Sequence, residues 1–264
     1  MKTYSIFETH AHYDDEAFEP DRDGLLSSLQ GNGIGTVVNV CASVGELGRT
    51  IALTEKYPFV YGAVGVHPDD ADKMTEQTLN EIRELSRREK ILAIGEIGLD
   101  YYWHKEEAAH EIQKKMFRAQ MDIAREEKLP FMIHSRDAAK DTLDIVKEYM
   151  DEGMYGGIIH CFSYGKEMAE QYLKMGLYLG IGGVVTFKNA KKLKEVVEYA
   201  PLEQLVLETD SPYLSPEPNR GKRNSSLNLP YVARTIGELK GISEEEVIRI
   251  TGQNAEKLLF HRIK

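Results

Sequence analysis

The fold of this chain is decided at YSIFETHAH, residues 4–12, where an apolar, β-prone run leads directly into His-Ala-His. The competing architecture is an open doubly wound sheet, which usually carries a glycine-rich phosphate-binding loop after its first strand. Two histidines stand there instead. They favour a (β/α)8 barrel, in which functional side chains lie at the carboxyl ends of the strands.

Seven more short apolar runs follow the first one, with helical segments between them. The eight runs are residues 4–8, 36–41, 60–66, 92–97, 130–133, 157–160, 178–182 and 204–208. Their hydrophobicity is continuous rather than alternating, which is typical of strands whose two faces are both buried. Eight strand–helix repeats predict an α/β fold, a parallel (β/α)8 TIM barrel.

The clearest helical pattern covers residues 106–128, where apolar side chains recur on one stripe among charges. The stripe consists of Ile112, Met116, Ala119, Ile123 and Ala124. Residues 243–260 predict an extra C-terminal helix, with Ser243 as its N-cap and Glu246 completing a capping box. We expect residues 1–264 to form a single domain, because α/β barrels commonly have this length.

Composition limits the classes of function. The chain is 42% hydrophobic and 29% charged, which is ordinary for a globular protein. A formal net charge of −10 argues against a surface that binds nucleic acid over its whole extent, although a local basic cleft stays compatible. The sequence shows no signal peptide and no stretch long enough to span a membrane. Cys41 and Cys161 are too few for a disulfide framework, so a reducing cytoplasm is the expected compartment.

Histidines gather at the predicted strand ends. Five of the eight histidines lie at or just beyond the ends of runs one, three, five and six: His10, His12, His67, His134 and His160. Chance would place about one histidine at such positions. His10 and His12 are two residues apart in an extended segment, so their side chains point to the same face. A pair of hydrogen-bonded core histidines is the alternative interpretation.

Two carboxylates complete the pattern. Glu96 and Asp210 stand at the ends of apolar runs, where burying a charge is costly unless a cation or hydrogen bonds compensate it. As an alternative, Asp210 could be a turn residue before Pro212. The candidate metal ligands are His10, His12, Glu96, His134, His160 and Asp210. Nitrogen and oxygen donors without cysteine suit magnesium, manganese, zinc or iron.

Six ligands are enough for one or two divalent ions. In a two-ion arrangement Glu96 bridges, His10, His12 and Asp210 hold one ion, and the remaining two histidines hold the other. Two ions would lower the pKa of a water and stabilise both the attacking and the leaving oxygen of a displacement. Asp210 would accept the proton of that water, so Asp210 and Glu96 are the candidate catalytic residues.

Several short motifs in fixed order carry a family resemblance. They are residues 9–12 (THAH), 65–68 (GVHP), 95–101 (GEIGLDY), 133–138 (IHSRDA), 160–163 (HCFS) and 208–214 (ETDSPYL). Over nearly the full chain the sequence resembles the TatD family of metal-dependent deoxyribonucleases, within the amidohydrolase-like barrels. The resemblance implies phosphodiester cleavage in DNA by a divalent metal bound to the same six residues, with single strands trimmed from the 3′ end.

Two departures from the family pattern stand out. The family usually has an aspartate where this chain has Glu8. Its motif after strand eight usually reads Arg-Gly-Lys-Arg-Asn-Glu-Pro, whereas residues 220–226 here read RGKRNSS and the altered loop runs over residues 225–230. Both departures concern the surroundings of the site and leave the six ligands in place.

A phosphate substrate requires cations or hydrogen-bond donors near the metals. Arg136 is placed for a bidentate phosphate contact, unless it pairs with Asp137 or another carboxylate at a helix start. His67 could contact the scissile phosphate or protonate the leaving oxygen, or else be structural. The loop after strand eight adds a basic run, which could hold a DNA backbone or simply be solvated: Arg220, Lys222 and Arg223.

Three aromatic residues occupy loops at the same face. Phe162, Tyr213 and Trp103 could stack on an unpaired base, although packing of the barrel mouth is the alternative and is preferred for Trp103. Two other functions stay open. A metal hydrolase of the amidohydrolase type would act on an amide, a lactone or an aminoacyl ester. A noncatalytic binding module would show a broken ligand set, whereas all six positions are filled here. The oligomeric state stays open.

Overall fold

A computed structural model describes residues 5–262 of the chain and contains eight strands in one sheet. The strands are β1 (Ile6–Ala11), β2 (Ile34–Val40), β3 (Val60–Val64), β4 (Ile91–Asp100), β5 (Phe131–Arg136), β6 (Gly157–Ile159), β7 (Tyr178–Ile181) and β8 (Leu205–Leu207). They are parallel and ordered β1 to β8, so the predicted (β/α)8 barrel is confirmed. Strand β1 continues beyond its predicted end to include His10, and residue 4 of the predicted run lies outside the described part.

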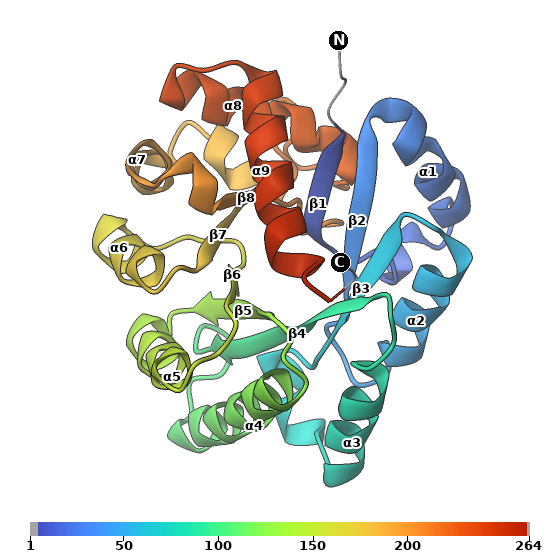
Figure 1. The fold of residues 1–264 in the computed structure, drawn as a ribbon, viewed down its shortest axis with the longest axis vertical. Helices are drawn as coiled ribbons and strands as arrows, with labels where there is room; N and C mark the ends of the chain where they lie inside the picture. The colour runs from blue at the N-terminus through green and yellow to red at the C-terminus, as the bar shows by residue number, and fades with distance from the viewer. Residues whose placement is uncertain (1–4, 263–264) are drawn as a thin grey trace.

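Helices surround the strands. They are α1 (Arg22–Leu29), α2 (Leu47–Lys56), α3 (Glu76–Leu85), α4 (Glu107–Glu126), α5 (Ala139–Asp151), α6 (Lys166–Lys174), α7 (Lys191–Tyr199), α8 (Leu229–Lys240) and α9 (Glu244–Leu259). Figure 1 shows α1 to α8 arranged around the sheet, with α9 in front of it near β1. The extra C-terminal helix is therefore confirmed. Within residues 5–262, no helix is both long and apolar enough to cross a membrane.

Helix α9 covers the amino-terminal end of the barrel. Its Leu258 and Leu259 are buried against inward-facing strand residues such as Phe7 and Val206. The side-chain amide of Asn254 donates hydrogen bonds to two carbonyl oxygens at the start of β8, those of Leu202 and Leu205. The opposite, carboxyl-terminal end is left for the candidate site.

The barrel closes between β1 and β8 at that carboxyl-terminal end. The Asp210 N–H donates to the His10 carbonyl (3.0 Å), and the His12 N–H donates to the Ser211 carbonyl (2.8 Å). Ala11 and Ser211 form an isolated parallel bridge. The seam that closes the barrel thus holds three of the six predicted ligands next to one another.

The predicted buried stripe of α4 is only partly right. Ile123 and Ala124 are buried, but Ile112 is 40% exposed, and two glutamines are buried instead, Gln113 and Gln120. The side-chain amide of Gln113 donates to the backbone carbonyl of Asp100 and accepts the Asp100 N–H. The side-chain amide of Gln120 does the same with the carbonyl and the N–H of Val66. Buried polar groups are tolerated when they are fully hydrogen-bonded. Here the two glutamine amides supply the hydrogen bonds that a neighbouring strand does not supply at the ends of β4 and β3.

The start of α9 also differs in part from its prediction. The Ser243 hydroxyl oxygen accepts the Glu246 N–H (3.2 Å), as an N-cap should. The Glu246 carboxylate does not return to the backbone and instead pairs with Arg249 one turn later. The N-cap is confirmed, whereas the reciprocal half of the capping box is wrong because an arginine competes for the carboxylate.

Candidate metal centre

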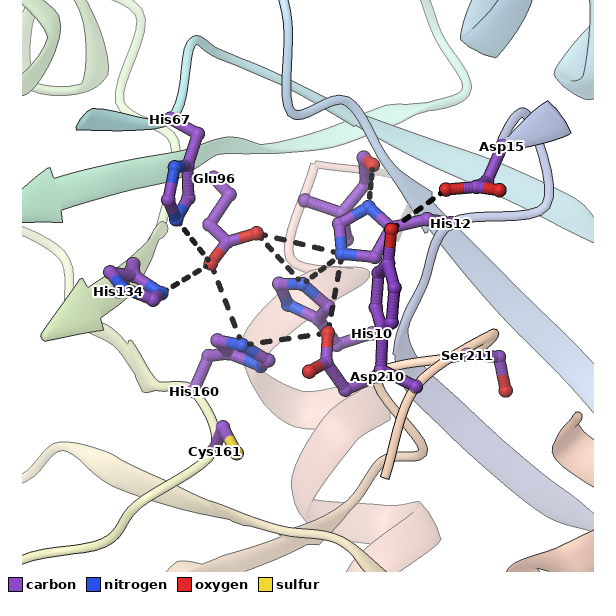
Figure 2. Close-up of polar contacts among 12 residues, drawn as sticks. His10, His12, Asp15, His67, Glu96, His134, His160, Cys161, Asp210 and Ser211 are labelled. Carbon is purple, nitrogen blue, oxygen red and sulfur yellow. Dashed lines mark hydrogen bonds and ion pairs between the residues drawn. The ribbon is translucent and has the colours of Figure 1, made fainter. Parts of the chain in front are cut away.

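All six predicted ligands converge at the carboxyl-terminal end of the barrel. His10, Glu96 and His134 lie on β1, β4 and β5, and the others follow the ends of β1, β6 and β8. Glu96 is 3% exposed and lies in the middle of the group (Figure 2). The ends of parallel strands bring these residues together although they are up to 200 positions apart in the sequence.

The two oxygens of Glu96 face different histidines. Its Oε2 atom lies 3.3 Å from His10 Nε2 and 3.6 Å from His12 Nε2. Its Oε1 atom lies 2.9 Å from His134 Nδ1 and 3.5 Å from His160 Nε2. Glu96 therefore divides the imidazoles into two pairs, the same division that the two-ion arrangement requires.

Asp210 stands across from Glu96 and adds a second carboxylate. Its Oδ1 atom is 3.3 Å from His12 Nε2 and 3.8 Å from His160 Nε2. The Asp210 carboxylate thus lies close to one histidine of each pair, and both of these histidines also face Glu96 (Figure 2).

Acceptors lie behind three of the four imidazoles. His12 Nδ1 and His134 Nε2 are hydrogen-bonded to the Val40 carbonyl oxygen (2.7 Å) and to Asp100 Oδ2 (3.1 Å), and His160 Nδ1 lies 3.2 Å from Glu208 Oε1 without hydrogen-bond geometry. A neutral imidazole has one N–H, and directing it at an acceptor leaves a lone pair on the other nitrogen. In all three rings that nitrogen faces the Glu96 carboxylate. Lone pairs and a carboxylate repel unless a cation lies between them, so these donors fit a divalent metal.

Protons compensate these charges when no metal does. Burial would raise the pKa of Glu96, but the neighbouring His160, His67 and His10 hold it well below its usual range. Burial opposes the charged form of His12, yet its hydrogen bond to Asp210 and the nearby carboxylates raise the pKa to about 10. Burial likewise opposes the charged forms of His134 and His160, but the surrounding carboxylates raise each pKa to about 9. A metal ion would have to displace protons from these rings.

His67 lies beside the centre, but its protonated ring nitrogen faces the site, whereas the three histidines above turn theirs away from it. Its Nδ1 accepts the Asp69 N–H (3.2 Å), so in the neutral ring Nε2 carries the proton. That Nε2 atom lies 3.7 Å from Glu96 Oε1. Burial and the nearby His134 lower the pKa of His67 to about 4, which keeps the ring neutral. His67 therefore presents a hydrogen-bond donor to the site rather than a lone pair.

Two carboxylates behind the histidines were not predicted from the sequence. Asp100 and Glu208 are buried, 1% and 0% exposed, and each faces the far nitrogen of one histidine. The signal was present, because both residues end apolar runs in the same way as Glu96. The cost of burying a carboxylate applies to them equally, but Asp100 is hydrogen-bonded to the His134 imidazole, and Glu208 lies beside the His160 imidazole and accepts the Cys161 N–H (2.6 Å).

The two departures from the family pattern meet in the structure. The fully buried Glu8 accepts a hydrogen bond from the Ser226 hydroxyl (2.9 Å). It also accepts from the backbone N–H of His10 and from both the N–H and the hydroxyl of Thr209. The longer Glu8 side chain thus reaches a serine of the altered loop and ties β1 to the segment that carries Asp210.

The arginines that were predicted to contact phosphate have different surroundings in the structure. Arg136 makes no ion pair within residues 5–262 and stacks on Tyr102, so pairing with Asp137 is not observed. Arg220 is exposed and lies over the Phe187 ring at 4.1 Å. The basic loop is smaller than expected, since Arg223 pairs with Asp21 on the surface near α1.

The aromatic expectations need two corrections. Phe162 is only 2% exposed and packs in the core, so it cannot stack on a base. Trp103 is 64% exposed, so the preferred packing role is wrong. Tyr213 is 54% exposed, and its hydroxyl donates to Asp15 (2.9 Å).

Comparisons with known proteins find similar sequences and a similar fold over nearly the whole chain. The family model described as TatD related DNase matches residues 7–260. The uncharacterized metal-dependent hydrolase YabD of Bacillus subtilis is 45% identical, over 96% of this chain and 98% of its own length. The crystal structure of YJJV, a TatD homologue from Escherichia coli, superposes with a TM-score of 0.88 at 27% identity and covers 96% of this chain and 97% of its own. The 3′-5′ ssDNA/RNA exonuclease TatD of Salmonella typhimurium is 28% identical, over 96% of this chain and 98% of its own length.

Proposed function

Because the chain belongs to the TatD-related family of metal-dependent hydrolases, we propose that it hydrolyses phosphodiester bonds in single-stranded DNA from the 3′ end. The relative from Salmonella typhimurium is named for 3′-5′ exonuclease action on single-stranded DNA and RNA. That name supplies the substrate class and the direction of the proposal. The geometry of this chain supplies the chemistry.

The observation that carries the proposal is the division of histidines by Glu96. His10 and His12 face Oε2, whereas His134 and His160 face Oε1. Together with Glu96 and Asp210, these histidines would hold one or two divalent ions, and magnesium, manganese and zinc all suit the nitrogen and oxygen donors. Two bound ions would lower the pKa of a water and stabilise both reacting oxygens of an in-line displacement.

The side chains of this protein would handle the proton and the phosphate. Burial would raise the pKa of Asp210, but its hydrogen bond to His12 and the neighbouring histidines lower it, so Asp210 is ionised and can accept a proton from the attacking water. The neutral His67 would donate its Nε2–H to a phosphate oxygen. Arg136, which has no carboxylate partner within residues 5–262, would donate to the same or the adjacent phosphate. Arg220 at the far edge of the mouth is the third proposed substrate contact.

A substrate panel tests this function. The purified protein, loaded with magnesium, manganese or zinc, is incubated with single-stranded DNA, a nitrophenyl phosphodiester, a cyclic amide and an aminoacyl ester. We expect metal-dependent hydrolysis of the two phosphodiesters. The matched variant Arg136→Ala should raise the KM for DNA, because a bidentate phosphate contact is lost, and should weaken the dependence of KM on salt.

Two outcomes would contradict the proposal. Hydrolysis of the amide or the ester with both phosphodiesters left intact would keep the metal centre and assign it to an amidohydrolase-type reaction. Absence of turnover on all four substrates, with metal bound, would favour a binding module. Unchanged KM and salt dependence in the Arg136→Ala protein would remove the phosphate role of Arg136 alone.

A further inference from the structure

Exposed aromatic rings and cations lie together beside the candidate metal centre. The aromatic-cation cluster consists of Tyr102, Trp103, Lys105 and Arg136, from the loop after β4 and the end of β5. Tyr102 and Trp103 are 42% and 64% exposed, and their rings meet edge to face with centroids 4.7 Å apart. The Arg136 guanidinium lies 3.9 Å from the Tyr102 centroid and 5.5 Å from that of Trp103. Lys105 Nζ is 5.2 Å from the Tyr102 centroid.

One carboxylate connects this cluster to the candidate centre. Asp100 Oδ1 accepts the backbone N–H groups of Tyr102 (2.9 Å) and Trp103 (3.1 Å). Its other oxygen, Oδ2, lies 3.1 Å from His134 Nε2. The aromatic loop is therefore held at a defined position relative to a proposed metal ligand.

The charges of the cluster suit an anionic ligand. In the described part of the chain neither Lys105 nor Arg136 has a carboxylate within ion-pair distance, although the whole chain carries a net charge of −10. Stacking on Tyr102 occupies one flat face of the guanidinium and leaves its N–H edge for a phosphate. The Trp103 ring, the most exposed large hydrophobic side chain of the cluster, offers a π face of the kind that stacks on a base.

We propose that the aromatic-cation cluster is a nucleotide subsite, in which Trp103 stacks on an unpaired base and Arg136 binds the phosphate next to the scissile bond. This inference rests on the proposed function and adds a reason for strand selection. A base that stacks on Trp103 has left its duplex partner, so the subsite favours single strands. Stacking uses the π face that every base has, so the subsite tolerates any sequence.

Trp103 is the only tryptophan of the chain, so its fluorescence reports directly on this subsite. The protein is titrated, with chelator present to prevent cleavage, with labelled oligothymidylate or with an abasic oligonucleotide of equal length and charge. We expect oligothymidylate to quench the tryptophan emission and to bind about 5-fold or more tightly than the abasic strand. By anisotropy of the labelled strand, Trp103→Ala should abolish this preference, and Trp103→Phe should retain most of it.

Tyr199→Ala is the matched control. Tyr199 on α7 is 41% exposed and carries a stacked cation, Lys166 Nζ at 4.3 Å from its centroid, but it takes no part in the candidate site. This variant should bind both strands as the unmodified protein does. Equal affinities for the two strands, or a preference that survives Trp103→Ala, would overturn the subsite.

Adding metal separates the two proposals. If oligothymidylate is preferred through Trp103 but is not cleaved, the subsite stands and the nuclease function fails. If the strand is cleaved while base and abasic strands bind equally, the nuclease function stands and the subsite fails. If neither strand binds and neither is cleaved, both proposals fail.

Discussion

Asp100 does two things at once at the scale of single residues. Its carboxylate faces His134 Nε2 with one oxygen and holds the loop of Tyr102 and Trp103 with the other. A carboxylate behind a metal-binding imidazole fixes the orientation of the ring and raises its basicity. The side chain that orients a proposed ligand is therefore also the one that positions the proposed nucleotide subsite.

The Asp100→Asn substitution should weaken metal binding at the His134 side. Removal of the negative charge lowers the basicity of His134 and lets the ring rotate, so we expect metal affinity to fall about 10- to 100-fold. Calorimetric titration of the metal-free protein measures this change. Asp141→Asn is the control, since Asp141 bonds to Tyr101 and Lys114 rather than to a histidine of the centre. Equal affinities in the two variants would contradict the role of Asp100.

The metal-free protein should lose stability as the pH rises. His12, with a pKa of about 10, and His134 and His160, each about 9, bind their protons more tightly in the folded chain than at the ordinary value of 6.5. The stability that this proton binding contributes to the folded state is fully present below about pH 6.5 and is lost as the pH rises through 9 to 10. Denaturant unfolding at pH 6.5 and pH 10 measures the loss.

His12→Asn is the matched variant for this pH dependence. Asparagine does not titrate in this range, so the variant should lose less stability between pH 6.5 and pH 10 than the unmodified protein. In the unmodified protein, metal affinity should rise with pH, because the histidines lose the protons that compete with the metal. A metal-free protein that is equally stable at both pH values would contradict the assignment of these protons.

At the scale of elements, the hydrophobic pattern predicts the positions of the strands well but predicts poorly the residues at which they end. All eight apolar runs are strands, because both faces of a barrel strand are buried and the runs are short and continuous. The end of β3 and the buried face of α4 were not predictable in this way. There Gln120 is buried because Val66 lacks a sheet partner, and no periodicity of apolar residues reports on a backbone group that needs a hydrogen bond.

The same reasoning explains which part of the site was predicted. Residues at strand ends were found by position and by the cost of burying charge. Asp100 and Glu208 obey the same rule, but their imidazole partners lie on other strands and become visible only in three dimensions. The bond from Ser226 to Glu8 joins residues 218 positions apart, so the two family departures could not be connected from the sequence.

Gln120→Leu should destabilise the fold through the end of β3. Leucine fills a similar volume but leaves the Val66 N–H and carbonyl without partners, at a cost of about 1–3 kcal/mol for each unsatisfied group. We expect the free energy of unfolding to fall by about 2–6 kcal/mol in urea titrations. Gln77→Leu, at an exposed position of α3, should change it by less than about 0.5 kcal/mol. Equal effects would show that the backbone bonds of Gln120 contribute nothing.

At the scale of the whole molecule, the two ends of the barrel have separate tasks. Helix α9 covers the amino-terminal end, whereas every candidate ligand lies in the carboxyl-terminal half of its strand or beyond the end of the strand. Leu258→Ala should therefore lower the free energy of unfolding by about 2–5 kcal/mol, as for other buried leucines, and leave metal affinity unchanged. A matched loss of metal affinity would show that the two ends are coupled.

The most direct test of a metal-dependent nuclease centre is cleavage of a single strand labelled at either its 3′ or its 5′ end. The unmodified protein, Glu96→Gln and the exposed control Glu195→Gln are compared with magnesium or manganese, and then with chelator. We expect the unmodified and control proteins to release the 3′ label first and to shorten the 5′-labelled strand stepwise, only with metal, while Glu96→Gln leaves both strands intact. Full-length strands in every lane, or equal cleavage by Glu96→Gln, would contradict the assignment of this site.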